Sequence, residues 1–395
     1  MIAPEPFFEP RGTPFSEYHR IRALLDLGHT VDLVTYPFGE DVSLPGLRVF
    51  RSLRPPFMHR IGIGPSFAKV PLDLALTLTA IRRALSDRYD VVHSHEEGAA
   101  IGVVLAALVG VPHVYDMHSS LPQQLTNFRF SRSRLLRWAF ERFERVAIGR
   151  SRVVIVICPE LERLVREIRP ASMPVLIENA PGAGDTVGGA DRDAVRREYG
   201  IGETTPLVLY TGTFEAYQGL DLLYAAAAVV VGARPDTQFL LAGGRPDQVH
   251  SARRAVAALG LADFVLFTGE RPAAEIPRLL AASDVLVSPR SRGTNTPLKI
   301  YQYLRSGRPI VATRLLTHTQ VLDDEIAILT GTTPTEFAAG ILRALERPDD
   351  AARIGAAAAR LAATKYSYEA YLARTREAIG RLGLGATAPV PGSAA

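Results

Sequence analysis

The strongest constraint on the fold of this chain is the alternation of short apolar strands with segments of helical periodicity along nearly all of its 395 residues. This alternation is typical of parallel α/β sheets, because a helix carries the chain back across the sheet between parallel strands. Met1 to Ala3 look like the end of a buried strand whose beginning is missing, which leaves an upstream start codon open. Further strands are predicted in the first half at 31–36, 90–94, 113–117, 152–157 and 174–177, with helices at 15–27, 71–86, 98–109, 133–148 and 160–168.

The same pattern restarts after a Gly-rich stretch at 178–190, ENAPGAGDTVGGA, which we interpret as an interdomain hinge. In the second half we predict strands at 207–211, 238–242, 264–268, 284–288 and 309–313, and helices at 219–231, 247–259, 273–281, 335–346, 351–362 and 367–381. The sequence therefore predicts two Rossmann-like domains, residues 1–178 and 179–366, that face each other across a cleft. Residues 383–395 are expected to form a disordered tail.

Composition and charge exclude several classes of protein. An apolar content of 47% with 22% charged residues is ordinary for a soluble globular chain, and a formal charge of +4 is too small and too spread for a nucleic-acid binder. The single cysteine, Cys158, excludes an intrachain disulfide and fits a reducing compartment. The opening residues lack a signal-peptide pattern, and no uncharged run reaches the roughly 18 residues of a membrane span. We expect a cytoplasmic protein, soluble or at most peripheral.

The most informative local motif is a polar loop and short helix that follow the fourth strand of the second half. Thr296 is a good N-cap and Pro297 suits the first helical position, so a helix is expected to begin there. A helix start at the carboxyl ends of parallel strands is an anion site, because free N–H groups point at the ligand. Lys299 lies in the first turn, with Arg290 and Arg292 just before it. These cations predict a diphosphate site; the alternative for Lys299 is a solvated helix residue.

Several polar residues are predicted at other strand ends, where the sites of α/β proteins lie. His118 closes the strand HVYDM and is expected to face the cleft. Gly212 occupies the matching position in the second half, where a missing side chain lets a ligand approach the backbone. His93 and His95 end a neighbouring strand without a third ligand at metal spacing, so we predict no metal site, although a role toward substrate stays open for them.

An Arg-rich segment at 129–152 has apolar residues at helical spacing on its opposite face. Two interpretations remain open. One is a helix that packs on the core and keeps a solvated basic face. The other is a surface for anionic lipid or a lipid-linked acceptor, which would place the protein at the inner face of the plasma membrane.

Taken together, four segments resemble the family 4 retaining glycosyltransferases, over nearly the whole chain: EPRGTPFSEYHRIRALLDLGHTVDLVTYP, PHVYDMHSS, YTGTFEAYQGLDLL and TPLKIYQYLRSGRPIVAT. The resemblance implies the glycosyltransferase-B fold, with helix 367–381 packing back on the first domain. It implies transfer of a sugar from a nucleoside diphosphate sugar to a glycan, lipid-linked or small-molecule acceptor, with retention. We also expect no metal, because no credible metal-ligand cluster is evident and Arg, Lys and a helix end are available for the phosphate charges, and no cofactor beyond the donor itself.

The resemblance also assigns roles to single positions. His118 corresponds to the family's cleft histidine beside the sugar, which makes it the candidate catalytic residue. The expected diphosphate ligands are Gly12, Gly212, Arg290, Arg292, Pro297, Leu298 and Lys299. The sugar and ribose are expected at Thr294, Asn295 and Gln302, and the base at Gly269, Glu270 and Arg271. The acceptor is expected beside Glu17, His19 and His95.

The sequence departs from the family pattern at four places. Phe214 and Gln218 stand at about the positions where the family often has an Arg and a Lys for the diphosphate. Thr294 and Gln302 replace two Glu residues eight positions apart. Gln302 can still hydrogen-bond a ribose, whereas Thr294 supplies no carboxylate. The lost carboxylates keep a second function open, a non-catalytic partner of another transferase that binds nucleotide-sugar. A sugar-nucleotide epimerase is disfavoured because no set of residues for proton abstraction is evident.

Overall fold

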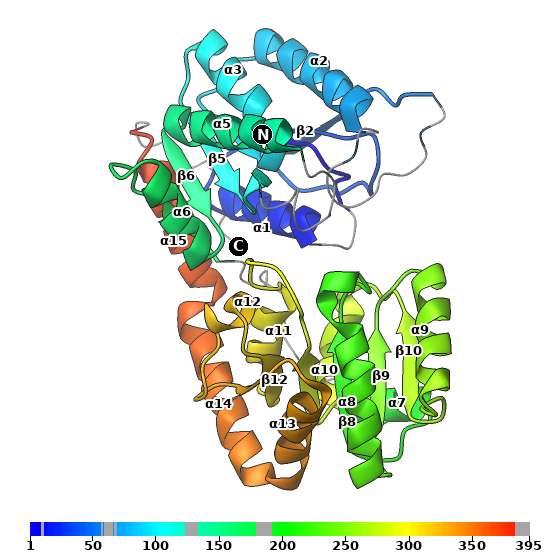
Figure 1. Ribbon diagram of the computed structural model, residues 1–395. Helices are drawn as coiled ribbons and strands as arrows, with labels where there is room; N and C mark the ends of the chain where they lie inside the picture. Colours follow the sequence, from blue (N-terminus) through cyan, green and yellow to red (C-terminus); the bar gives the residue numbers. More distant parts are fainter. Residues whose placement is uncertain are drawn as a thin grey trace. The chain divides into compact units, whose positions relative to one another are not determined.

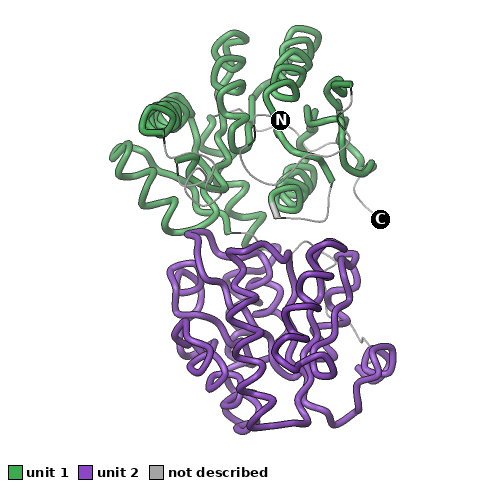
Figure 2. The backbone as a smooth tube through the Cα atoms, turned by 45° about the vertical axis from the view of Figure 1, so that its right-hand side comes forward, with its two compact units in different colours: residues 1–179, 369–395 green, residues 180–368 purple. Residues whose placement is uncertain are grey.

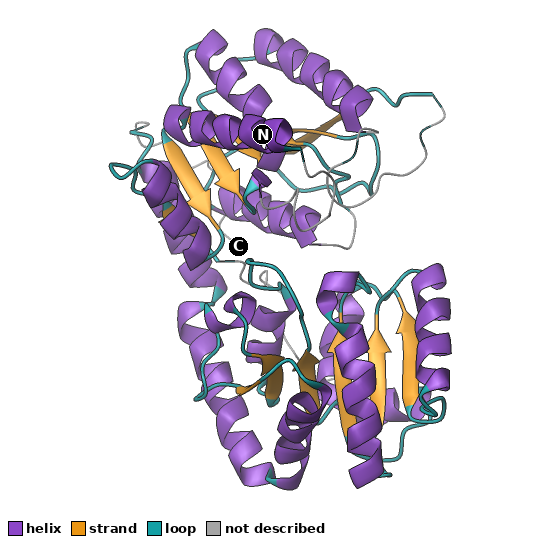
Figure 3. Ribbon diagram, in the orientation of Figure 1, coloured by secondary structure: helices purple, strands orange, loops and turns teal. Residues whose placement is uncertain are grey.

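The computed structural model describes residues 1–8, 12–56, 58, 66, 69–122, 133–178 and 192–383. The chain divides into two compact units (Figure 2). Unit 1 contains residues 1–179 and 369–395, and unit 2 contains residues 180–368. Each unit has its own parallel sheet between layers of helices, so each is described by itself (Figure 3). Most of the predicted hinge and tail lie outside the described residues.

Unit 1 contains a seven-stranded sheet in the order β3-β2-β1-β4-β5-β6-β7, and every neighbouring pair is parallel. The strand order reverses between β1 and β4, which makes the carboxyl ends of these strands a topological switch point, the usual ligand position in open α/β sheets. The strands are β1 (Ile2–Ala3), β2 (Val31–Thr35), β3 (Leu47–Arg51), β4 (Val92–His95), β5 (His113–Met117), β6 (Val153–Val156) and β7 (Val175–Leu176).

Helices cover both faces of this sheet (Figure 1). They are α1 (Gly12–Asp26), α2 (Val70–Ser86), α3 (Ala99–Val109), α5 (Arg134–Arg150), α6 (Pro159–Ile168) and α15 (Tyr368–Gly380). One apolar cluster joins α1 and α15 to β1 and β2, and another joins α2 and α3 to the opposite face. Along that face α2 contacts α3, and α3 contacts α5. Among the described helices, none is both long enough and apolar enough to cross a membrane.

A buried ion pair connects the beginning and the end of the chain within unit 1. Arg20 on α1 donates from Nε to Asp116 Oδ2 at 2.8 Å and from Nη1 to Thr375 Oγ1 on α15 at 3.2 Å. Its guanidinium carbon lies 4.9 Å from the ring centroid of Tyr371. Burial by itself raises the pKa of Asp116, but the charge of Arg20 and the contacts with two histidines outweigh it and hold the pKa well below its usual range.

Unit 2 contains a six-stranded parallel sheet in the order β10-β9-β8-β11-β12-β13, with its switch point between β8 and β11. The strands are β8 (Leu207–Thr211), β9 (Gln238–Ala242), β10 (Val265–Gly269), β11 (Val285–Ser288), β12 (Ile310–Thr313) and β13 (Ile328–Thr330). The helices are α7 (Arg192–Glu198), α8 (Leu220–Ala233), α9 (Pro246–Ala258), α10 (Ile276–Ala282), α11 (Lys299–Ser306), α12 (Leu316–Thr319), α13 (Pro334–Glu346) and α14 (Pro348–Lys365). Two apolar clusters fill the two faces of the sheet.

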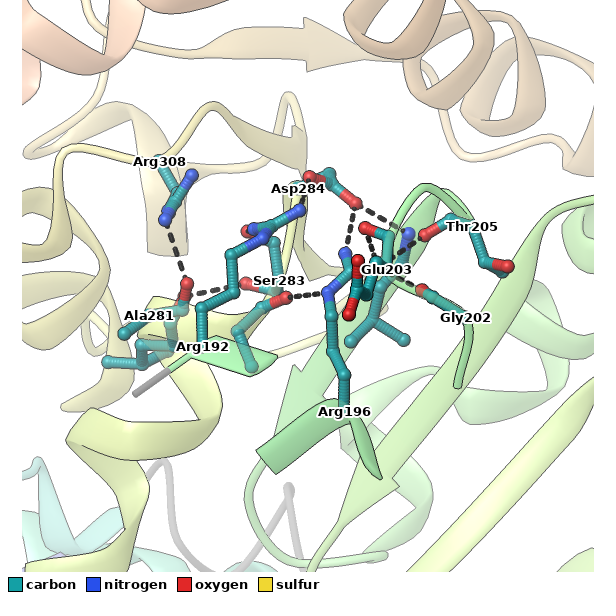
Figure 4. A network of polar contacts seen from close by, with 12 residues as sticks. Arg192, Arg196, Gly202, Glu203, Thr205, Ala281, Ser283, Asp284 and Arg308 are labelled. Atoms are coloured by element: carbon teal, nitrogen blue, oxygen red, sulfur yellow. Dashed lines mark hydrogen bonds and ion pairs between the residues drawn. The ribbon is translucent and has the colours of Figure 1, made fainter. Parts of the chain in front are cut away.

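The amino-terminal edge of this sheet is closed by a polar network around Arg196 (Figure 4). Arg196 is fully buried and donates to the carbonyls of Ala282, Gly202 and Thr205 at 3.0, 2.7 and 2.8 Å. Asp284 accepts from Arg196 Nη2 and from the Leu207 amide, at 2.7 and 2.8 Å. Because every donor has an acceptor, this network has a structural role, and it lies at the opposite end of the strands from the candidate site.

The predicted fold class is confirmed, but two edge strands and one helix start differ from the predictions. The edge strands β3 and β13 were not predicted. The expected helix start is wrong, because α11 begins at Lys299 and Leu298 occupies the cap position in helical conformation. The amides of Ile300 and Tyr301 already bond three residues back, to Pro297 and Leu298, so a tight turn precedes the helix. The Thr296 hydroxyl is buried and caps nothing among the described residues.

Replacing Arg20 with Met is expected to lower the free energy of unfolding by about 3–5 kcal/mol, because it leaves the Asp116 carboxylate buried and uncompensated. Urea denaturation measures the change. Adding Asp116→Asn should recover part of the loss, since the second substitution removes the stranded charge. The exposed Arg82 provides the matched control, where Arg82→Met should change stability by no more than about 0.5 kcal/mol. An equal loss of stability in Arg20→Met and Arg82→Met would show that the Arg20–Asp116 ion pair does not stabilise unit 1.

Candidate functional site

The candidate site in unit 2 lies at the carboxyl ends of β8, β9 and β11, where glycines bring backbone segments into close contact. Gly212 follows β8 with φ +135°, and a Cβ there would lie 3.1 Å from Lys299 Nζ. Gly243 follows β9 with φ +127°, and a Cβ there would lie 2.0 Å from the Gly212 carbonyl oxygen. Both positions therefore require glycine. The backbone at Gly212 and Gly243 therefore carries no side chains, and at Gly212 it lies directly beside Lys299.

Lys299 is the central cation of this site. The residue is only 8% exposed, and Nζ has no hydrogen-bond partner among the described residues. Nζ lies 3.8 Å from the ring centroid of Tyr210, a cation–π contact. Burial, and then the charge of Arg290, hold the pKa of Lys299 well below its usual range. A buried amine without a counter-ion is costly, and such groups concentrate at functional sites.

Arg290 is the second cation, and its own loop fixes its position. It donates from Nε to the Arg292 carbonyl at 2.9 Å and from Nη1 to the Asn295 carbonyl at 3.0 Å. Gly293 has φ +112°, and a Cβ there would lie 2.9 Å from Arg290 Nη2. Burial lowers the pKa of Arg290. No carboxylate lies within ion-pair distance of Arg290 or Lys299 in the described part of the chain, so the two cations are a candidate anion site.

The other residues predicted on the donor side are placed as follows. Arg292 is exposed, whereas Thr294 and Asn295 are half-buried, and the Thr294 carbonyl accepts from Gln320 Nε2 at 2.6 Å. Gln302 is half-buried, three residues beyond Lys299 and therefore on the same side of α11. At the end of β10, Gly269 accepts from the Gly243 amide at 2.8 Å, Glu270 is exposed and Arg271 is half-buried.

His318 supports this site and was missed by the sequence analysis, because it lies in a segment without clear periodicity. Its Nε2 is 2.8 Å from Ser288 Oγ at the end of β11, and its Nδ1 donates to the Thr313 carbonyl at the end of β12, at 2.7 Å. Burial lowers the pKa of His318 to about 3, so the ring is neutral. We assign it a structural role, holding the two strand ends together.

In unit 1 the carboxyl ends of β4 and β5 bring three histidines around Asp116. His118 Nε2 lies 3.2 Å from Asp116 Oδ1 and 3.3 Å from His95 Nδ1. His93 Nε2 lies 3.3 Å from Asp116 Oδ2, and the rings of His93 and His95 stack at 5.0 Å. Asp116 was not singled out in the sequence, although its position two residues before His118 in the predicted strand was the available signal.

The expectation that His93 and His95 lack a third ligand is wrong, because one ligand atom from each of His93, His95 and Asp116 lie within 4.8 Å of one another. The chemistry of this group nevertheless fits an ion-pair network better than a divalent cation. Asp116 Oδ2 already accepts from Arg20 at 2.8 Å, and a metal ion there would lie next to a guanidinium. Burial lowers the pKa of both His93 and His95 and so favours neutral rings, the form that also ligates metals. Only the guanidinium of Arg20 therefore argues against a cation here.

Acidic side chains lie near the same strand ends. Glu17 on α1 is fully buried, and burial raises its pKa to about 8, with the Asp116 charge acting in the same direction. Glu96 follows β4 with φ +46° and accepts from Ser119 Oγ at 2.9 Å; burial raises its pKa well above the usual range. His19 is half-buried on α1, and Gly12 is the first residue of that helix.

Two family models match the chain. Residues 205–347 match the model described as glycosyl transferases group 1, and residues 18–180 match the model described as glycosyl transferase 4-like domain. The chain is 30% identical over 309 residues to the alpha-D-kanosaminyltransferase of Streptomyces kanamyceticus, covering 73% of this chain and 76% of that protein. It is 26% identical over 378 residues to the D-inositol 3-phosphate glycosyltransferase of Thermobispora bispora, covering 90% and 86%.

Solved structures show the same fold over nearly the full length. Sucrose-phosphate synthase from Thermosynechococcus elongatus has a TM-score of 0.79 at 20% identity, covering 98% of this chain and 99% of that one. Anabaena HepE, in complex with UDP and glucose, has a TM-score of 0.73 at 18% identity, covering 96% and 98%. These likenesses show that the chain has the same fold of two α/β domains.

The pKa of Glu17 predicts a specific pH dependence of stability. The folded state keeps its proton up to a pKa of about 8, whereas the unfolded carboxyl releases it near the ordinary 4.5. The folded state thus binds more protons across this window, and the free energy of unfolding should fall as pH rises through it. Urea denaturation at several pH values should show a flatter profile for Glu17→Gln. An unchanged slope in that variant would show that Glu17 does not retain its proton.

Proposed function

Because the chain belongs to the group 1 glycosyltransferases of family 4 and has their glycosyltransferase-B fold, we propose that it transfers a sugar from a nucleoside diphosphate sugar with retention of anomeric configuration. The acceptor that we propose is a hydroxyl of a glycan, a lipid-linked sugar or a small molecule. The name of the Streptomyces relative, a kanosaminyltransferase, is consistent with sugar transfer. The Anabaena structure contains UDP, which supports a diphosphate in a fold of this type.

The observation that carries the proposal is a pair of cations without a counter-ion in the described part of unit 2, the buried Lys299 and the half-buried Arg290. A donor diphosphate would supply the missing charge, and Gly212 leaves room for it beside Nζ. As the bond to the sugar breaks, negative charge grows on the leaving diphosphate. Fixed cations in a water-poor site stabilise that charge more strongly than solvent does. The mechanism we propose is front-face, and the leaving diphosphate helps to deprotonate the acceptor hydroxyl.

We place the rest of the donor along the same edge of unit 2. Gln302 lies on α11 near Lys299, and its amide offers both a donor and an acceptor to the ribose hydroxyls. Gly269, Glu270 and Arg271 are proposed to hold the base, largely through backbone groups. Thr294 and Asn295 are proposed to contact the sugar, together with the backbone of their loop. Arg292, Pro297, Leu298 and Gly12 complete the proposed surroundings of the diphosphate.

The acceptor is assigned to unit 1. His118 is the proposed catalytic residue, and Asp116 is a positioning residue, because it lies 3.2 Å from the His118 ring. Glu17, His19 and His95 are the proposed acceptor-side groups. The charge of Arg20 helps to keep Asp116 ionised, so a negative charge lies beside the His118 ring.

We also propose that transfer needs no divalent metal. Two preorganised cations at the diphosphate perform the electrostatic task that a metal ion performs in other transferases. A chelator should therefore leave the transfer rate unchanged, whereas loss of activity with recovery on adding magnesium or manganese would contradict this point.

One observation favours a second function, a non-catalytic partner that binds nucleotide-sugar. Thr294 and Gln302 stand where the family carries two carboxylates. Binding needs the cation pair alone, whereas transfer also needs the sugar to be oriented. The two functions therefore make the same prediction for nucleotide binding and opposite predictions for turnover.

Calorimetry with uridine and guanosine diphosphates tests the donor site. Lys299→Met should weaken binding by roughly one to two orders of magnitude, since a charge-assisted contact is worth about 1.5–3 kcal/mol. The same variant should be at least as stable as the wild type without ligand, because it removes an unpaired buried cation. Lys365→Met, at an exposed lysine of the same unit, is the matched control and should bind normally. Unchanged affinity in Lys299→Met would refute the assignment.

Turnover then separates the two functions. The wild type, incubated with a panel of nucleotide-sugars and simple acceptors, should transfer or slowly hydrolyse one donor. NMR should show the donor's anomeric configuration in the product. Tight nucleotide binding with no turnover of any donor would favour the non-catalytic partner, and inversion would contradict the retaining mechanism.

A further inference from the structure

Exposed apolar side chains are concentrated on one part of unit 1. Of the 13 large hydrophobic residues that are exposed in the described part of the chain, eight lie on three helices. These helices, α2, α3 and α5, are neighbours on one side of the sheet (Figure 1). We call their exposed surface the α2–α3–α5 face. Its apolar residues are Val70, Leu74, Leu78, Leu85, Val104, Leu108, Leu135 and Trp138.

Helix α2 is apolar on two sides. Its inner side contributes Leu72, Leu76 and Ala80 to the core of unit 1. Its outer side presents Val70, Leu74 and Leu78, which are 60%, 62% and 58% exposed. These three residues are spaced four apart and form a continuous stripe along the helix. The inner side accounts for packing, so the outer stripe needs another explanation.

Helix α3 continues this surface. Its sequence, AAIGVVLAALV, contains no charged residue. Gly102, Leu105 and Ala106 are buried against the sheet, whereas Val104 and Leu108 are 57% and 71% exposed. An outer helix side without any charge is unusual for a solvated helix, which normally carries polar residues there.

Helix α5 adds positive charge and an aromatic residue. Leu135 and Trp138 are 73% and 61% exposed beside five arginines. Both acids of the helix are engaged: Glu141 pairs with Arg137 at 2.9 Å, and Glu144 accepts from the Leu121 amide at 2.9 Å. Four arginines have no carboxylate within ion-pair distance among the described residues, and these are Arg134, Arg142, Arg145 and Arg150. The helix thus presents unpaired cations next to exposed apolar side chains.

We propose that the α2–α3–α5 face adsorbs to the surface of a lipid bilayer that contains anionic headgroups. Apolar side chains partition into the acyl boundary, Trp sits at the headgroup level, and arginines meet lipid phosphates. A second copy of the chain fits less well, because a two-fold contact through this face would bring α5 and its cations against themselves. The inference goes beyond the proposed function and depends on unit 1 alone, so it holds or fails independently of the donor site.

Trp138 makes the test direct, because it is the only tryptophan in the chain. The full-length protein is mixed with vesicles of phosphatidylcholine alone, or of phosphatidylcholine with phosphatidylglycerol. On the anionic vesicles the Trp138 emission should shift to shorter wavelength and become protected from acrylamide. Affinity for neutral vesicles should be at least tenfold lower, and added salt should weaken binding to the anionic ones.

Paired variants identify the surface. The double variants Leu74→Ser with Leu78→Ser, and Arg142→Ala with Arg145→Ala, should each lower affinity for anionic vesicles by about tenfold or more. Matched controls in unit 2 are Leu259→Ser and Arg254→Ala, at exposed positions, which should bind like the wild type. Calorimetric affinity for nucleoside diphosphates should be the same in all four, which keeps this test separate from that of the donor site.

Three outcomes would overturn the proposal. The first is no spectral change of Trp138 with either vesicle. The second is an equal loss of vesicle binding in the face variants and the controls. The third is a blue shift that appears with protein concentration alone and disappears in the same face variants, which would assign the α2–α3–α5 face to a contact between copies.

Discussion

A charge that is removed from water must be compensated, and the two units of this protein meet that requirement in opposite ways. In unit 1 the Asp116 carboxylate is buried at the end of β5 and is paired with Arg20 at 2.8 Å. In unit 2 the buried Lys299 and the half-buried Arg290 lie at the equivalent edge of the other sheet, and no described carboxylate is paired with either. The buried charge of Asp116 is thus compensated within unit 1, whereas we propose that the two cations of unit 2 are compensated by a bound anion.

This difference has consequences for stability and for binding. The Arg20 pair links α1, β5 and α15, so it supports the local structure around His118. The two cations Lys299 and Arg290 act in the opposite direction, because placing them together without a counter-ion lowers the stability of the free protein. We propose that a bound diphosphate offsets this cost. Cation–π contacts reduce this cost, because the Tyr210 ring lies against Lys299 and the Tyr217 ring against Arg290. A site of this kind gains affinity because the ligand relieves an electrostatic cost that the free protein already has.

The sequence predicted what local patterns determine. The strands His113–Met117, Leu207–Thr211 and Gln238–Ala242 were placed to the residue, because each is a short apolar run buried on both faces. The half-exposed edge strand Leu47–Arg51 lacks such a run and was missed. Lys299 and Arg290 were named from an expected helix start that was wrong, and Gly212 was named separately from its place at a strand end.

The remaining features depend on contacts that no local pattern encodes. Arg20 and Thr375 are separated by 355 positions, and only the folded chain shows that they meet. The same holds for the carboxylate of Asp116 among three histidines, and for His318 between two strand ends. Only part of the α2–α3–α5 face was predicted, namely the basic side of α5. The exposed apolar residues of α2 and α3 cannot be told from core residues in the sequence, because both sides of these helices are apolar.

The most direct test of the central claim is the number of protons taken up when a nucleoside diphosphate binds. Burial holds the pKa of Lys299 low in the free protein, and phosphate oxygens beside Nζ would raise it, so binding should take up protons at pH values between the two. Calorimetry in buffers of different ionisation enthalpy measures this number. We predict proton uptake by the wild type that disappears in Lys299→Met. Equal proton uptake by both proteins would contradict it.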